Sequence, residues 1–139
     1  MPQEITCLIA DDHEVVREGL RLSLSRAPHI RVVGEASDGA GAVALAERRR
    51  PNVVIMDVRM PGMDGLAVLA LARELDVAPE VVMLTGNSTV EIAVEAMKLG
   101  ACDFVTKPCS LDALDQILRK AGEKKSLRRE NLLMKRRLA

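Results

Sequence analysis

Five short apolar runs alternate with segments whose apolar residues recur at helical spacing. The runs occupy residues 5–10, 30–36, 53–56, 81–84 and 102–106. Runs of this length are typical of strands buried on both faces of a parallel sheet. Because successive parallel strands need crossover helices, the alternation predicts an α/β fold with a doubly wound, five-stranded parallel sheet and right-handed crossovers.

Polar side chains follow four of the five predicted strands. Asp11 and Asp12 come directly after the first strand, Asp57 after the third, Thr85 after the fourth and Lys107 after the fifth. Open α/β sheets bind their ligands at the carboxyl ends of the strands. We therefore expect these five side chains to converge at one edge of the sheet.

Three carboxylates at one edge repel one another. At ~5 Å and an effective dielectric constant near 20, each pair costs about 3 kcal/mol. Lys107 is one offsetting cation, and Mg²⁺ suits oxygen ligands such as Asp12 and Asp57. A carboxylate is also a nucleophile toward phosphorus, and phosphoryl transfer requires mainly positioning and charge neutralisation. The residues therefore predict a Mg²⁺-dependent acyl phosphate on Asp57, with Thr85 and Lys107 beside the phosphoryl group.

The order of these motifs resembles that of the receiver domains of bacterial two-component response regulators. The resemblance covers about Ile5 to Ala121, and its motifs are the acidic pair 11–12, Asp57 with MPGMDG at 60–65, Thr85-Gly86 and Lys107-Pro108. It implies a flavodoxin-like (CheY-like) fold with the strand order 2-1-3-4-5.

The resemblance also implies a role for each site residue. Asp57 would be the phosphorylation site, and Thr85 and Lys107 would bind the phosphoryl oxygens. Asp12 would bind Mg²⁺ directly and Asp11 through water. The backbone carbonyl of Arg59 would complete the protein ligands. The domain would accept its phosphoryl group from a sensor histidine kinase. It would be a regulatory domain that catalyses only its own phosphorylation and dephosphorylation.

Several neighbouring residues have secondary roles. Phe104 stands where relatives have a switch aromatic, most commonly Tyr, that turns inward when the threonine moves; simple packing is its alternative role. The Lys107-Pro108 peptide is expected to be cis. Arg59 and Asn87 occupy positions that tune phosphoryl lifetime in the family, in a direction that the sequence does not predict.

Some of these residues have simpler alternatives. Asp11 or Asp12 alone could cap the first helix, Thr85 could be a cap, and Lys107 a surface residue. His13 follows the acidic pair, but Mg²⁺ prefers oxygen, so we interpret His13 as a spectator.

The last helix is predicted to extend beyond the domain. From Arg119 onward the chain holds nine of the 20 Lys and Arg residues and two of the 20 Asp and Glu residues, so this tail carries +7 and the remainder −7. Leu127, Asn131, Met134 and Leu138 have the 4-3-4 spacing of a coiled-coil seam. We predict a receiver domain at residues 1–122 and a helical linker at 123–139 that pairs with a second chain.

The two ends of the chain suggest different output domains. SLRRENLLMKRRLA at the C-terminus resembles the linker to AAA+ ATPase domains in sigma-54-dependent activators, whereas ADDHEVVREGLRLSL resembles receivers that carry a LuxR-type helix-turn-helix. A receiver that stands alone is a further alternative. We favour the ATPase type, since the tail reports on the junction itself. We expect the output domain to be absent from these 139 residues. Phosphorylation would change dimerisation, through the tail or through the face formed by the fourth helix, fifth strand and fifth helix.

Composition limits the remaining classes. No apolar run approaches the ~20 residues of a membrane span, and no signal pattern opens the chain, so we expect a cytoplasmic protein. Cys7, Cys102 and Cys109 lack CxxC spacing, so we expect free thiols. With Phe104 as the sole aromatic, we expect no direct nucleic-acid binding. The rival functions are a phosphohydrolase with an aspartate nucleophile, whose usual D-x-D motif is missing after the first strand, and a protein-binding domain that is not phosphorylated.

Overall fold

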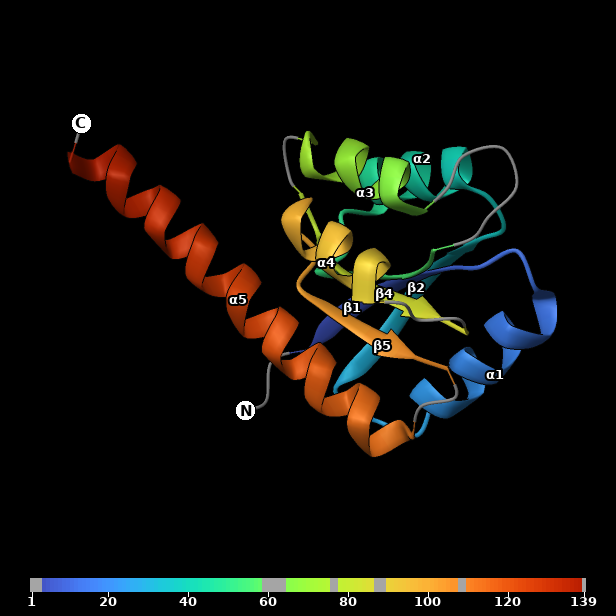
Figure 1. Ribbon diagram of the computed structural model, residues 1–139. Coiled ribbons are helices and arrows are strands. Elements are labelled where there is room, and N and C mark those ends of the chain that lie inside the picture. The colour runs from blue at the N-terminus through green and yellow to red at the C-terminus, as the bar shows by residue number, and fades with distance from the viewer. Residues whose placement is uncertain (1–3, 59–64, 76–77, 87–89, 108–109, 139) are drawn as a thin grey trace.

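The computed structural model describes residues 4–58, 65–75, 78–86, 90–107 and 110–138, with side chains of the last helix as far as Lys124. Strands and helices alternate (Figure 1) in the order β1 (Ile5–Ala10), α1 (Glu14–Leu24), β2 (Ile30–Ala36), α2 (Gly39–Arg49), β3 (Val53–Asp57), α3 (Gly65–Arg73), β4 (Glu80–Thr85), α4 (Val90–Lys98), β5 (Asp103–Thr106) and α5 (Leu111–Leu138). Each strand lies within one residue of the apolar run that predicted it.

All five strands are parallel and form one sheet in the order β2-β1-β3-β4-β5, which confirms the predicted fold. In the centre of the sheet, Ile55 of β3 pairs with Ile9 of β1 and with Val82 of β4. The carboxyl ends of β1 and β3 are therefore adjacent, and those of β4 and β5 follow on one side. This order brings polar residues from separate parts of the sequence to the same edge.

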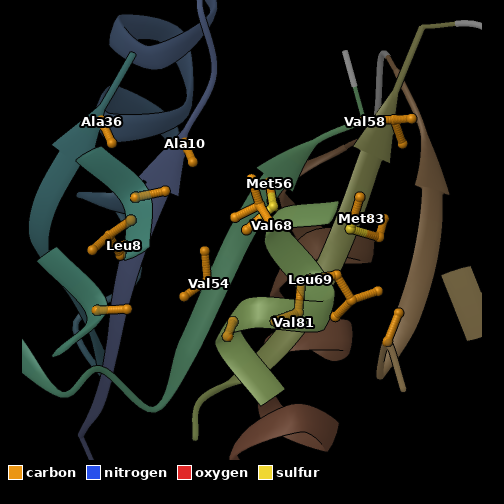
Figure 2. Close-up of a cluster of buried hydrophobic side chains, with 14 of the residues drawn as sticks. Leu8, Ala10, Ala36, Val54, Met56, Val58, Val68, Leu69, Val81 and Met83 are labelled. Atoms are coloured by element: carbon orange, nitrogen blue, oxygen red, sulfur yellow. The ribbon is translucent and has the colours of Figure 1, made fainter. Parts of the chain in front are cut away.

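Alternate residues of each strand face opposite layers of helices. Val54 and Met56 of β3 pack in a core with residues of α2, α3 and α4, whereas Val53 and Ile55 pack in a second core with residues of α1 and α5. Figure 2 shows the first of these cores, with Val68 of α3 beside Met56. Aliphatic residues dominate both cores, so the sheet that positions the site is rigid without aromatic packing.

The helix ends follow the sequence except at α1. Asp38 Oδ1 accepts a hydrogen bond from the Gly41 N–H (2.7 Å) and Ser110 Oγ from the Ala113 N–H (3.1 Å), so Asp and Ser, two residue types that commonly cap helices, cap α2 and α5. The alternative that Asp12 caps α1 is wrong: the N-cap is His13, whose side chain makes no capping hydrogen bond. The Asp11 carboxylate accepts the His13 N–H at 2.9 Å, and this Asx-type turn precedes α1, which begins at Glu14.

Other helix ends tighten or are not described. Helix α1 ends at Leu24, four residues before Pro28, where its last turn tightens and the Arg26 N–H bonds to the Ser23 carbonyl at 3.2 Å. Asp64 and Ser88, which precede α3 and α4 and are of residue types that cap helices, lie outside the described residues.

Gly100 ends α4 with a positive φ of 102°, and a Cβ there would lie 2.9 Å from Arg73 Nε. Replacing Gly100 by Ala will therefore lower the free energy of unfolding by about 1–2 kcal/mol. A Cβ added to Gly19, inside α1, would meet no neighbouring residue within 4 Å, so Gly19→Ala will raise stability by about 0.5–1 kcal/mol. Urea denaturation measures both; equal effects of the two substitutions would contradict the backbone argument.

Helix α5 continues without interruption through the polar stretch at 123–125 to Leu138. Its buried side chains are Leu114, Leu118 and Ala121, which pack in the second core. In Figure 1 the later turns project away from the sheet. The side chains of the predicted coiled-coil seam lie outside the described residues, so that seam stays a prediction. Within the described chain, no helix is both long and apolar enough to cross a membrane.

Candidate phosphoacceptor site

Four side chains that could ligate a metal ion converge at the carboxyl edge of β1 and β3. One ligand atom from each of Asp11, Asp12, His13 and Asp57 lies within 4.8 Å of the others. Asp11 is 1% exposed and Asp57 7% exposed. The predicted convergence of acids from two strands is therefore present, with two of the three carboxylates buried.

The Lys107 ammonium joins these carboxylates from the end of β5. Its Nζ lies 2.7 Å from Asp11 Oδ2 and 3.5 Å from Asp57 Oδ2. The alternative of a surface lysine is therefore wrong, since Lys107 bridges acids from two other strands. With neutral His13, three carboxylates and one ammonium leave a formal charge of −2 at the site.

The environment of Asp11 favours its ionised form. Burial alone would raise the pKa of Asp11, but the hydrogen bonds from Lys107 and from the His13 N–H, with the Lys107 charge, together outweigh burial and lower that pKa below 3.8. The stability that this carboxylate contributes is therefore present above about pH 4 and is lost as pH falls through its native pKa.

Thr85 lies at the same edge as Asp57. Asp57 pairs with Leu84, so Thr85 is one residue further along the neighbouring strand, and it is 2% exposed. The Thr85 carbonyl accepts the Lys107 N–H at 2.7 Å, which ties the backbone that carries the ammonium to the end of β4. Thr85 and Lys107 are thus positioned together by strand pairing.

Phe104 is half-buried and packs against the core on the side of α2, α3 and α4. It pairs with Met83 in the β4–β5 register, two residues before the position that pairs with Thr85. This packing is compatible with either predicted role of Phe104, switch or core residue.

Two residues near the start of α1 complete the surroundings of the acids. His13 Nδ1 lies 3.3 Å from Asp11 Oδ1 and 3.1 Å from Asp12 Oδ1. The Arg17 guanidinium donates to the Asp11 carbonyl at 2.6 Å and so holds the turn after β1. Arg17 could not be identified from the sequence, because a hydrogen bond to a backbone carbonyl six residues away leaves no mark in the residue pattern.

A second contact that the sequence does not predict lies at the opposite end of the sheet. His29 Nε2 lies 2.5 Å from Asp115 Oδ1, and Arg119 Nε 3.2 Å from Asp115 Oδ2. Burial would raise the pKa of Asp115, but the hydrogen bonds and charges of His29 and Arg119 lower it. His29 therefore helps to anchor α5 to the loop before β2.

The donor set fits Mg²⁺. Asp12 Oδ1 is buried and accepts no hydrogen bond within the described part of the chain, so an acceptor atom faces the site without a protein donor. Asp11, Asp12 and Asp57 would hold the ion, whose charge would offset the remaining negative charge. Three predicted participants, Arg59, Asn87 and Pro108, lie outside the described residues.

Comparison with known proteins identifies the family of this arrangement. A sequence model of the response regulator receiver domain matches residues 7–119. The chain is 37% identical over 106 residues to the probable transcriptional regulatory protein NarL of Mycobacterium tuberculosis, covering 76% of this chain and 49% of NarL. It is 38% identical over 123 residues to the regulatory protein AtoC of Escherichia coli, covering 88% of this chain and 26% of AtoC.

Solved structures agree with the sequence matches. The signal receiver domain of the putative response regulator NarL from M. tuberculosis has a TM-score of 0.79 at 32% identity, covering 90% of this chain and 98% of that domain. A two-component response regulator of the LuxR family from Aurantimonas has a TM-score of 0.77 at 32% identity, covering 82% and 81%.

The chain spans about half the length of NarL and about a quarter of AtoC, so the match concerns one domain of these relatives. That domain is regulatory. In this chain, its sheet edge brings three carboxylates together with the Lys107 ammonium. The chain belongs to the receiver domains of the two-component response regulators.

Proposed function

We propose that Asp57 is the residue that accepts the phosphoryl group, from a histidine kinase or a small phosphodonor. The observation that carries this proposal is the position of the Asp57 carboxylate, buried at the end of β3 with the Lys107 ammonium 3.5 Å away and the acids of β1 beside it. A buried carboxylate with a nearby cation is kept ionised and oriented, as a nucleophile requires.

In the transfer, an Asp57 carboxylate oxygen forms a bond to phosphorus while the bond from phosphorus to the donor's nitrogen or oxygen breaks and its electron pair leaves with the donor. Lys107 stabilises the negative charge on the phosphoryl oxygens, and the Thr85 hydroxyl hydrogen-bonds to one of them. Asp11, Asp12 and Asp57 would hold Mg²⁺, which would supply the remaining charge neutralisation.

The response is carried by β4, β5 and α5. Movement of Thr85 toward the phosphoryl group opens space that Phe104 fills, and the Lys107–Thr85 backbone contact links the two strands. Phosphorylation changes the populations of two such arrangements only as far as it stabilises one of them more than the other. The linker at 123–139 continues α5 beyond the receiver domain. Through it, the change in the receiver alters the homodimer and the output domain.

The output of the full-length protein is transcription regulation in the cytoplasm. The NarL relative is described as a transcriptional regulator, which supports this class. The tail favours an ATPase-type output of sigma-54-dependent activators, and the LuxR-family structure from Aurantimonas supports the alternative.

The test is phosphorylation of the intact chain. Incubation with acetyl phosphate or beryllofluoride and Mg²⁺ will give one stable adduct by intact mass, absent without Mg²⁺ and absent in Asp57→Asn. Sedimentation of the same samples will show whether the adduct changes the oligomeric state. Multiple turnover of acetyl phosphate would instead support a phosphohydrolase, and the absence of any adduct would support a protein-binding domain.

A further inference from the structure

The His13 imidazole lies at the rim of the acidic site and is directed at two of its carboxylates. Its Nδ1 is 3.3 Å from Asp11 Oδ1 and 3.1 Å from Asp12 Oδ1. Two ligand atoms bound to one ion at about 2.1 Å stand roughly 3.0–3.4 Å apart for octahedral to tetrahedral angles. The nitrogen therefore has the spacing of a third ligand, and its side chain, 68% exposed, is accessible to an ion from solvent.

The imidazole Nδ1 is hydrogen-bonded to Asp11 Oδ1 at 3.3 Å, and an ion bound between these two atoms would replace that bond. His13 is the N-cap of α1 but makes no capping hydrogen bond with its side chain. Asp12 Oδ1 is buried and accepts no hydrogen bond among the described residues, although the imidazole nitrogen is close. The cation at the inner side of the cluster, Lys107, contacts Asp11 Oδ2 and not the Oδ1 atom that faces His13.

Imidazole nitrogen changes which ions a carboxylate site prefers. Mg²⁺ binds through oxygen and gains little from a nitrogen ligand, whereas Co²⁺, Ni²⁺ and Zn²⁺ bind imidazole well. We propose that this site also binds a divalent cation of the Co²⁺, Ni²⁺ and Zn²⁺ class, with His13 Nδ1 as a ligand beside Asp11 and Asp12. This inference rests on the proposed function, because the same carboxylates would hold Mg²⁺. The two kinds of ion would then compete for the phosphoacceptor site.

The test compares two metal ions on the metal-free chain with its thiols reduced. Co²⁺ and Mg²⁺ are titrated by calorimetry, and the visible and near-ultraviolet bands of Co²⁺ distinguish nitrogen and oxygen ligands from thiolates. The wild type will bind Co²⁺ at least about tenfold more tightly than Mg²⁺. His13→Ala and His13→Gln will each weaken Co²⁺ binding by about tenfold or more and change Mg²⁺ affinity by less than about twofold.

The other histidine is the matched control. His29→Ala, at the opposite end of the sheet, will leave both affinities unchanged. If both His13 variants bind Co²⁺ as tightly as the wild type, or lose Co²⁺ and Mg²⁺ equally, His13 is a carboxylate partner only and the inference is overturned. If the wild type binds no Mg²⁺ and forms no adduct, the proposed function itself fails. If it binds Mg²⁺ and forms the adduct, but the His13 variants keep the wild-type affinity for Co²⁺, only this inference is overturned.

Discussion

Replacing Lys107 by Met will lower the free energy of unfolding of the metal-free domain by about 3 kcal/mol. The ammonium is the hydrogen-bond donor to Asp11 Oδ2, and the side chains of Lys107, Asp11 and Asp57 are 21%, 2% and 8% exposed. Removing one partner of such a buried pair leaves an uncompensated carboxylate, which typically costs about 3–5 kcal/mol. Urea denaturation in the presence of a chelator measures the loss.

The same substitution weakens the pH dependence of stability that Asp11 contributes. In the wild type the Asp11 pKa is below 3.8, so its stabilisation is lost as pH falls through that value. Without Lys107, the hydrogen bond and the charge that most lower this pKa are lost, so the pKa rises and protonation relieves the repulsion. The stability difference between wild type and variant will therefore narrow below about pH 4.

Lys120→Met is the matched control for the Lys107 variant. Lys120 is exposed on α5, so its loss will change stability by less than about 0.5 kcal/mol. Saturating Mg²⁺ will recover part of the loss in the Lys107 variant, because the ion replaces the missing positive charge. A Lys107 variant as stable as the Lys120 variant would show that the ammonium does not compensate the acids.

The sheet and the convergence of the site follow from the sequence because they depend on periodicity and chain order. Val53 to Met56 is an apolar run that ends at Asp57, and in a parallel sheet such an end can lie only at the carboxyl edge. The strand order did not follow from spacing; it came from the resemblance to a family and was then confirmed.

Contacts between side chains distant in sequence could not be predicted in this way. His29 and Asp115 are 86 residues apart, and nothing in either local pattern indicates that they meet. That neither Asp11 nor Asp12 caps α1 depends on the direction of the Asp11 carboxylate, which accepts the His13 N–H. Such choices involve about 1 kcal/mol, too little to leave a signature in composition or periodicity.

Replacing Leu118 by Ala will lower the free energy of unfolding by about 3 kcal/mol. Leu118 is fully buried in α5 and packs in the core that also contains Val82 and Leu84 of β4. Truncation removes buried apolar surface and leaves a cavity that the rigid sheet cannot fill. Leu22, 58% exposed on α1, is the matched control, and Leu22→Ala will cost less than about 0.5 kcal/mol.

The two halves of α5 will differ in the same measurement. Ending the chain after Lys124 removes only turns that project from the domain in Figure 1, so at low protein concentration the free energy of unfolding will change by less than about 0.5 kcal/mol. An isolated helical tail of this length is marginal without a partner, so the truncated chain will lose self-association instead. A truncation as costly as Leu118→Ala in the monomer would place the domain boundary beyond residue 122, since the tail would then be part of the folded core.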